Sequence, residues 1–149
     1  MRRPVAAVAA GVLVIEAVVI AFVNLVLGLA VKRQSMSLGG LAPGAMSTGA
    51  FAAGAAFALF LLCCAAIAVR AAIVDRSPGR FARIALVVCA VLHCVLGAAV
   101  VGMVGWLAFV AMMVTLGLVV ATLVLYAELG APRNGAAPEG GGTASPTSP

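Results

Sequence analysis

Residues 84–127 contain no Asp, Glu, Lys or Arg, and this uncharged stretch constrains the fold more than any other feature of the sequence. Its forty-four residues are too many for one membrane-spanning helix, which needs about 20 apolar residues, but they suit two such helices. Gly102 and Gly105 lie near its middle and predict a tight hairpin there. The two predicted spans are about residues 82–102 and 105–127.

Two further apolar runs precede this stretch, at about residues 5–31 and 48–69. The first would be about 40 Å long as a helix, which exceeds a hydrocarbon core of about 30 Å. A secretory signal peptide is the alternative, but the apolar region of such a peptide has only about 7–15 residues and ends at a small-residue cleavage site. This run instead ends at Lys32 and Arg33, so we expect it to form the first span. The glycines and Pro43 of residues 32–47 predict a loop.

The composition favours a membrane protein over a soluble one. The chain is 65% hydrophobic and 9% charged, with a mean hydropathy of +1.27, whereas soluble domains are about half apolar and a quarter charged. We therefore predict an all-α membrane protein, with residues 1–129 forming four transmembrane helices in an up-down-up-down bundle. Residues 130–149 are mostly Gly, Pro, Ala, Ser and Thr, which predicts a disordered cytoplasmic tail.

The basic residues lie between the apolar runs and predict the orientation of the chain. An inside N-terminus places seven of the nine on the inner side and leaves only Lys32 and Arg33 outside, as the positive-inside rule favours. Attraction to anionic lipid then explains the net charge of +5 without a nucleic-acid partner. The Lys-poor, Arg-rich composition resembles that of chains from high-GC bacteria. We expect a bacterial plasma membrane location with both termini cytoplasmic.

Ionisable residues at bilayer depth are costly, so they are functional candidates. Glu16 lies about 16 Å, and His93 about 15–18 Å, from the inner ends of their predicted helices at 1.5 Å per residue. Cys89 precedes His93 by one helical turn and shares its face, and Asn24 lies on the same broad side of its helix as Glu16. We predict an intramembrane polar cluster of these four residues.

Three interpretations of the cluster compete. In the first, Glu16 is neutral or bonded to His93 and simply holds the first helix against the third, because burial disfavours the charged form of a carboxyl group. In the second, Glu16 couples protons or cations to transport, with His93 as a relay. A Glu embedded in the first of four short helices resembles that of the small multidrug resistance transporters, which implies such coupling. The aromatic pattern of that family's second and third helices is missing, since the only Trp and Tyr are Trp106 and Tyr126.

The third interpretation is a metal, haem or thiol redox site built from the cysteines and His93, since thiolates and imidazole suit soft metals. However, the chain has no Cys-x-x-Cys motif and a single His, and the adjacent Cys63 and Cys64 point about 100° apart on a helix. We therefore predict no metal and no cofactor, and interpret the four cysteines as small hydrophobic residues.

Small residues recur every four positions in the second span, at Ala50, Gly54 and Ala58. Such spacing lets another helix approach closely in lipid, although Ala and Gly are abundant throughout this chain. No catalytic or nucleotide-binding motif is present, so we predict no enzyme activity. The expected function is a structural or accessory membrane protein, packing against itself or another membrane protein, with the proton- or cation-coupled transporter as the alternative.

Overall fold

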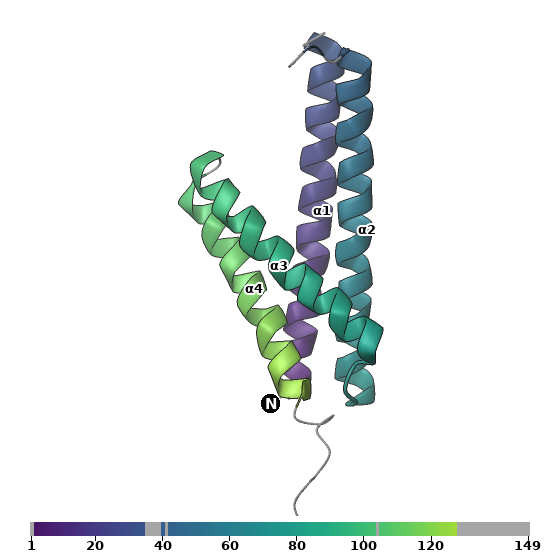
Figure 1. Ribbon diagram of the computed structural model, residues 1–149, viewed down its shortest axis with the longest axis vertical. Coiled ribbons are helices and arrows are strands. Elements are labelled where there is room, and N and C mark those ends of the chain that lie inside the picture. The colour runs from purple at the N-terminus through teal and green to yellow at the C-terminus, as the bar shows by residue number, and fades with distance from the viewer. Residues whose placement is uncertain (1, 35–39, 41, 104, 128–149) are drawn as a thin grey trace, which may run out of the picture.

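The computed structural model describes residues 2–34, 40, 42–103 and 105–127, and this part of the chain is all-helical. Each of the four helices is long and apolar enough to cross a membrane. The predicted tail at residues 130–149 lies outside the described residues. The helices, shown in Figure 1, are α1 (Arg2–Gln34), α2 (Pro43–Val74), α3 (Arg80–Met103) and α4 (Trp106–Ala127).

Helices α1 and α2 are longer than the sequence predicted, with 33 and 32 residues. Helix α2 begins at Pro43, inside the region predicted to be a loop, so that boundary was wrong. Proline is well suited to the first helical position, because its backbone has no N–H and its φ angle is already helical. Ala42 before it is extended, with φ −61° and ψ 142°, as the steric restriction ahead of a proline requires.

The α2–α3 turn and the α3–α4 turn each contain a residue with a positive φ angle. Asp75 ends α2 with φ 53° and ψ 36°, and its N–H donates to Ala71 O at 3.0 Å. Asp is one of the few residues with a side chain that tolerate this conformation. Its carboxylate also accepts from Arg3 Nε at 3.3 Å, which joins the end of α2 to the start of α1. Gly105, at φ 112°, separates α3 from α4 at the predicted hairpin.

The four helices form two hairpins rather than an evenly packed bundle. Figure 1 shows α1 and α2 side by side over their length, and theirs is the most extensive contact between helices. The α3–α4 hairpin meets this pair near the lower end of the view and leans away from it above. Large apolar side chains of the upper half of α1 are exposed, among them Phe22 at 63% and Val26 at 49%, and so are Val8 and Ile15 in its lower half.

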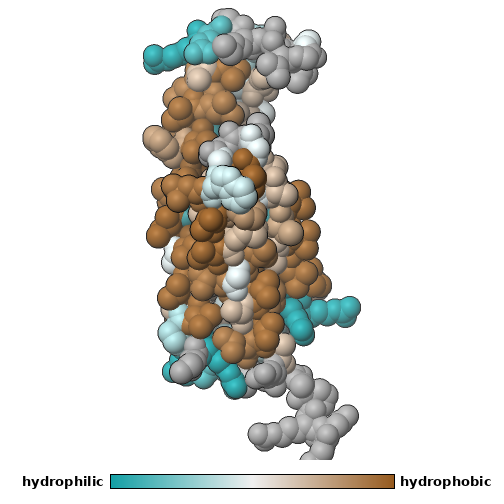
Figure 2. Space-filling model, turned by 90° about the vertical axis from the view of Figure 1, so that its left-hand side faces the viewer, coloured by the Kyte–Doolittle hydropathy of each residue, from teal (hydrophilic) through white to brown (hydrophobic). Residues whose placement is uncertain are grey.

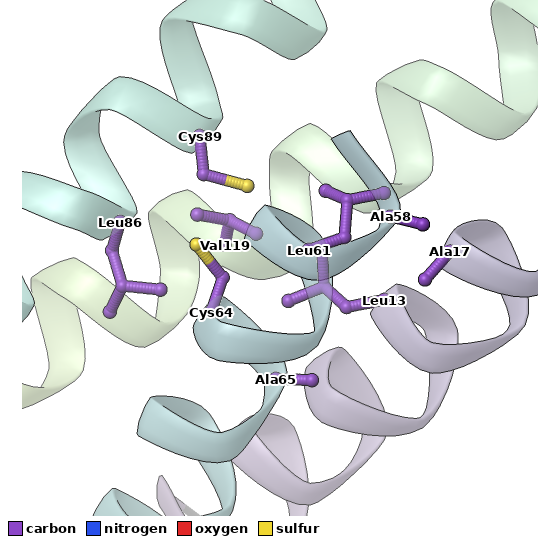
Figure 3. Packing of buried hydrophobic residues seen from close by; sticks show 9 residues of the cluster. All are labelled: Leu13, Ala17, Ala58, Leu61, Cys64, Ala65, Leu86, Cys89 and Val119. Carbon is purple, nitrogen blue, oxygen red and sulfur yellow. The ribbon is translucent and has the colours of Figure 1, made fainter. Parts of the chain in front are cut away.

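Small side chains line the seam between α1 and α2. Ala6, Ala10 and Ala17 of α1 are buried, and Gly28 of α1 and Gly54 of α2 leave no room for a Cβ atom. Close approach of backbones through small residues is how helices pack where lipid removes the hydrophobic driving force. Toward the lower end this seam continues into a core that involves all four helices. Figure 3 shows its members, which are Leu13, Ala17, Ala58, Leu61, Cys64, Ala65, Leu86, Cys89 and Val119.

The surface is divided into an apolar band and two hydrophilic ends. Figure 2 shows brown surface along most of the length, with teal groups gathered near the top and near the bottom. Lys32 and Arg33 belong to the last turn of α1, whereas Arg80 and Arg83 begin α3 at the opposite end. An apolar band between two charged ends is compatible with four helices that are long and apolar enough to cross a membrane.

Candidate functional site: a buried Glu–His pair

The structure brings Glu16 of α1 and His93 of α3 into direct contact. Glu16 Oε2 lies 2.8 Å from His93 Nε2, and the two side chains are 10% and 1% exposed. The other ring nitrogen of His93, Nδ1, lies 2.7 Å from the carbonyl oxygen of Cys89, one turn earlier on α3. Both nitrogens of the ring are therefore satisfied, and the ring orientation is held from both sides.

These two contacts determine where protons must be. The Cys89 carbonyl oxygen can only accept a hydrogen bond, so Nδ1 of His93 carries a proton. The contact between Nε2 and Oε2 then needs one proton between two groups that both accept when deprotonated. That proton resides either on the carboxyl group or on the imidazole, and the Glu16–His93 pair is electroneutral in both forms. Without it, two lone pairs would face each other at 2.8 Å.

Cys89 adds its side chain as well as its carbonyl oxygen to this region. Its Sγ lies 3.6 Å from His93 Nδ1, and Figure 3 shows the sulfurs of Cys64 and Cys89 both directed into the space between α2 and α3. Cys64 Sγ lies 3.8 Å from Ala85 O, so this thiol links α2 to α3. Sequence reasoning had not placed Cys64 in the cluster. The signal available in the sequence was the depth of Cys64 in the membrane, which is close to that of Cys89. The remaining two cysteines, Cys63 and Cys94, are exposed.

Asn24 takes a different place from the one expected. Its Nδ2 donates to Ile20 O of the same helix at 2.9 Å, and its side chain packs where Gly54 of α2 has no Cβ atom. No hydrogen bond within the described part of the chain joins it to Glu16. The structure thus corrects the four-residue cluster to Glu16, His93 and Cys89, because the rotation of about 80° between positions 16 and 24 turns Asn24 toward α2.

The small residues of α2 pack within the chain itself. Gly54 and Ala58 are buried and Ala50 is half-buried. At Gly54 an added Cβ atom would overlap the Asn24 side chain, and Ala58 belongs to the four-helix core. Gly54 therefore forms part of the α1–α2 seam, and Ala58 is used in the core. They are not left free for an external partner.

Tyr126 of α4 faces the α1–α2 pair rather than the outer surface. It is fully buried against Ala6 of α1 and Ala71 of α2, because alanines on both helices leave space for its ring. Its hydroxyl has no hydrogen-bond partner among the described residues. Trp106, at the start of α4, is 73% exposed.

A groove between α1 and α4 is lined in part by the Glu16 side chain. Its volume is about 440 Å³. Apart from Glu16 and Thr115 its lining is apolar, and Thr115 Oγ1 donates to Ala111 O at 3.1 Å within its own helix. The other lining residues are Val12, Ile15, Val19, Ile20, Ala108, Ala111, Met112 and Val114.

Residues 2–34, 40, 42–103 and 105–127 contain no group of three or more His, Cys, Asp or Glu side chains placed to hold a metal ion. The chain matches no protein-family model, and comparison with curated proteins and with solved structures finds no significant match. The fold and site therefore define a class only: a small chain with four membrane-length apolar helices and one buried carboxyl–imidazole pair.

Proposed function

We propose that this chain is a multi-pass membrane protein with a structural or accessory role, in which the Glu16–His93 pair holds α1 against α3. The observation that carries the proposal is the closed chain of hydrogen bonds from Glu16 through His93 to the Cys89 carbonyl oxygen. Because the pair is electroneutral and both ring nitrogens are hydrogen-bonded, its burial in lipid costs little free energy. Neither of the two contacts needs water or a substrate.

The proposed topology is up-down-up-down with both termini cytoplasmic, in a bacterial plasma membrane. The arginines at the start of α1, around the α2–α3 turn and at the start of α3 support it, because they share one end of the fold and outnumber Lys32 and Arg33 at the other. The same arrangement places the uncovered upper half of the α1–α2 hairpin in the outer leaflet. We propose this surface as the one that packs against a second membrane protein.

Site-specific cross-linking tests the accessory role. A photoreactive amino acid replaces Phe22, on the uncovered half of α1, and a matched one replaces Val124 of α4, which is 57% exposed near the opposite end. After irradiation in native membranes, the Phe22 position is expected to yield a discrete protein adduct that the Val124 position does not. Lipid adducts alone at both positions would contradict the accessory role.

A proton-coupled transporter is the second candidate, and the direct Glu16–His93 contact favours it, since such a contact places one titratable proton inside the helices. Coupling requires that proton to leave, which turns the contact into a repulsion between two acceptors and separates the side chains. In liposomes containing a pH-sensitive dye, the transporter predicts a proton flux that Glu16→Gln abolishes. The structural role predicts no flux above protein-free vesicles for either protein.

A further inference from the structure

The groove between α1 and α4 has an apolar lining and one carboxyl group, of which a single oxygen is hydrogen-bonded. Oε2 of Glu16 is bonded to His93, whereas Oε1 has no hydrogen bond from any described residue. The Glu16 side chain is nine-tenths buried and lines the groove. This oxygen is accessible from the groove, and hydrocarbon tails cannot donate a hydrogen bond to it, so it stays without a partner in lipid at a cost in free energy.

From this geometry we infer that the groove is a binding site for a neutral, membrane-dissolved molecule with a hydrocarbon body and one hydroxyl donor, which bonds to Glu16 Oε1. The neutrality of the ligand follows from the neutrality of the Glu16–His93 pair, which already contains the proton that balances the carboxylate. A cationic headgroup would enter an apolar groove without a free counter-charge, and burying an unpaired charge is costly. A hydroxyl donor needs no counter-charge.

The shape of the groove agrees with such a ligand. Ala108 and Ala111 of α4 leave space opposite Val12 and Val19 of α1, and the volume of about 440 Å³ accommodates a chain-like molecule. Specific small-molecule sites have this character, with a mostly apolar lining and a few polar groups that orient the ligand. Because the groove lies between two helices of the apolar band, the ligand enters it sideways from the membrane.

The single histidine of the chain provides the readout. Protein with ¹⁵N-labelled histidine is placed in lipid nanodiscs and titrated with 1-dodecanol or with dodecyl methyl ether, which lacks the donor. A hydrogen bond to Oε1 withdraws charge from the carboxyl group and shifts the His93 Nε2 resonance. We expect a saturable shift with dodecanol and a roughly 5- to 10-fold weaker response to the ether, as one hydrogen bond contributes.

A groove-filling variant and its control separate this site from general partitioning into lipid. Ala111→Phe fills the groove from α4 and leaves the residues of the pair unchanged, so it should keep the His93 resonances of the free protein and lose the dodecanol shift. Ala66→Phe, at an exposed position of α2 away from the groove, should keep both.

Three results would overturn the inference. The first is an equal response to alcohol and ether, which means that the groove takes any alkyl chain. The second is an unchanged dodecanol shift in Ala111→Phe, which places the binding elsewhere. The third is a response to dodecylammonium without one to dodecanol, which makes the ligand a cation.

Discussion

Replacing Glu16 by residues of similar length separates the hydrogen bond of the pair from its charge. Leu removes every polar atom and leaves His93 Nε2 without a partner in a side chain that is 1% exposed. Gln keeps an N–H donor that can reach the same nitrogen, since Nδ1 already carries the imidazole proton. Stability should therefore follow the order wild type, Glu16→Gln, Glu16→Leu.

The magnitude follows from two opposing considerations. Leaving a buried acceptor unsatisfied costs about 1–3 kcal/mol in soluble proteins. Hydrogen bonds between transmembrane helices average only about 0.6 kcal/mol, because the unfolded chain in a membrane also finds partners. We expect Glu16→Leu to lose about 1–2 kcal/mol on these grounds, and Glu16→Gln to lose less than about 0.5 kcal/mol.

Unfolding by SDS in mixed micelles, followed by far-UV circular dichroism, measures these differences. The ¹⁵N spectrum of His93 reports in the same samples whether Nε2 keeps a donor. If Glu16→Leu is as stable as the wild type, the pair does not hold α1 against α3. If Glu16→Gln is as unstable as Glu16→Leu, the charge of the carboxylate, and not a hydrogen bond to Nε2 alone, stabilises the pair.

Three pairs of substitutions test the packing and the turns by the same unfolding assay. Gly54→Leu should destabilise the α1–α2 hairpin by at least about 2 kcal/mol through overpacking, whereas Gly49→Leu on the same helix meets open space and should cost less than about 0.5 kcal/mol. Gly105→Ala should cost about 1–3 kcal/mol because φ is 112° there, and an equal cost for Gly102→Ala would refute that reason. Asp75→Gly should stay within about 1 kcal/mol of the wild type, since glycine accepts φ 53° and the exposed ion pair contributes little, whereas Asp75→Val should be clearly less stable.

The sequence alone indicated the helices and their approximate limits, because the absence of charge over about 20 residues is a sufficient signal for a membrane-length helix. It also located the α3–α4 turn around Gly102 to Gly105, and the structure has Gly102 within α3 and the positive φ angle at Gly105. The start of α2 was misjudged, since Pro43 is compatible with either a loop or a first helical turn.

Within the site, helical depth brought Glu16 and His93 to the same level, and that was enough to suggest a pair. The depth of a residue along its helix, however, does not say in which direction its side chain points. Whether a side chain faces a neighbouring helix or lipid depends on how each helix is rotated, and the Ala- and Val-rich sequence has little contrast to show this. The rotation of α1 directs Glu16 to α3 and turns Asn24 to α2.

Only the tertiary structure decided that the four helices form two hairpins that diverge, that Gly54 and Ala58 are used inside the chain, and that a groove reaches Glu16. The physical reason is that hydropathy identifies which segments avoid water, whereas the contacts between apolar helices depend on the shapes of their side chains. Shape complementarity between Gly54 and Asn24, or between Tyr126 and the alanines around it, is a property of two helices together. It cannot be read from either helix alone.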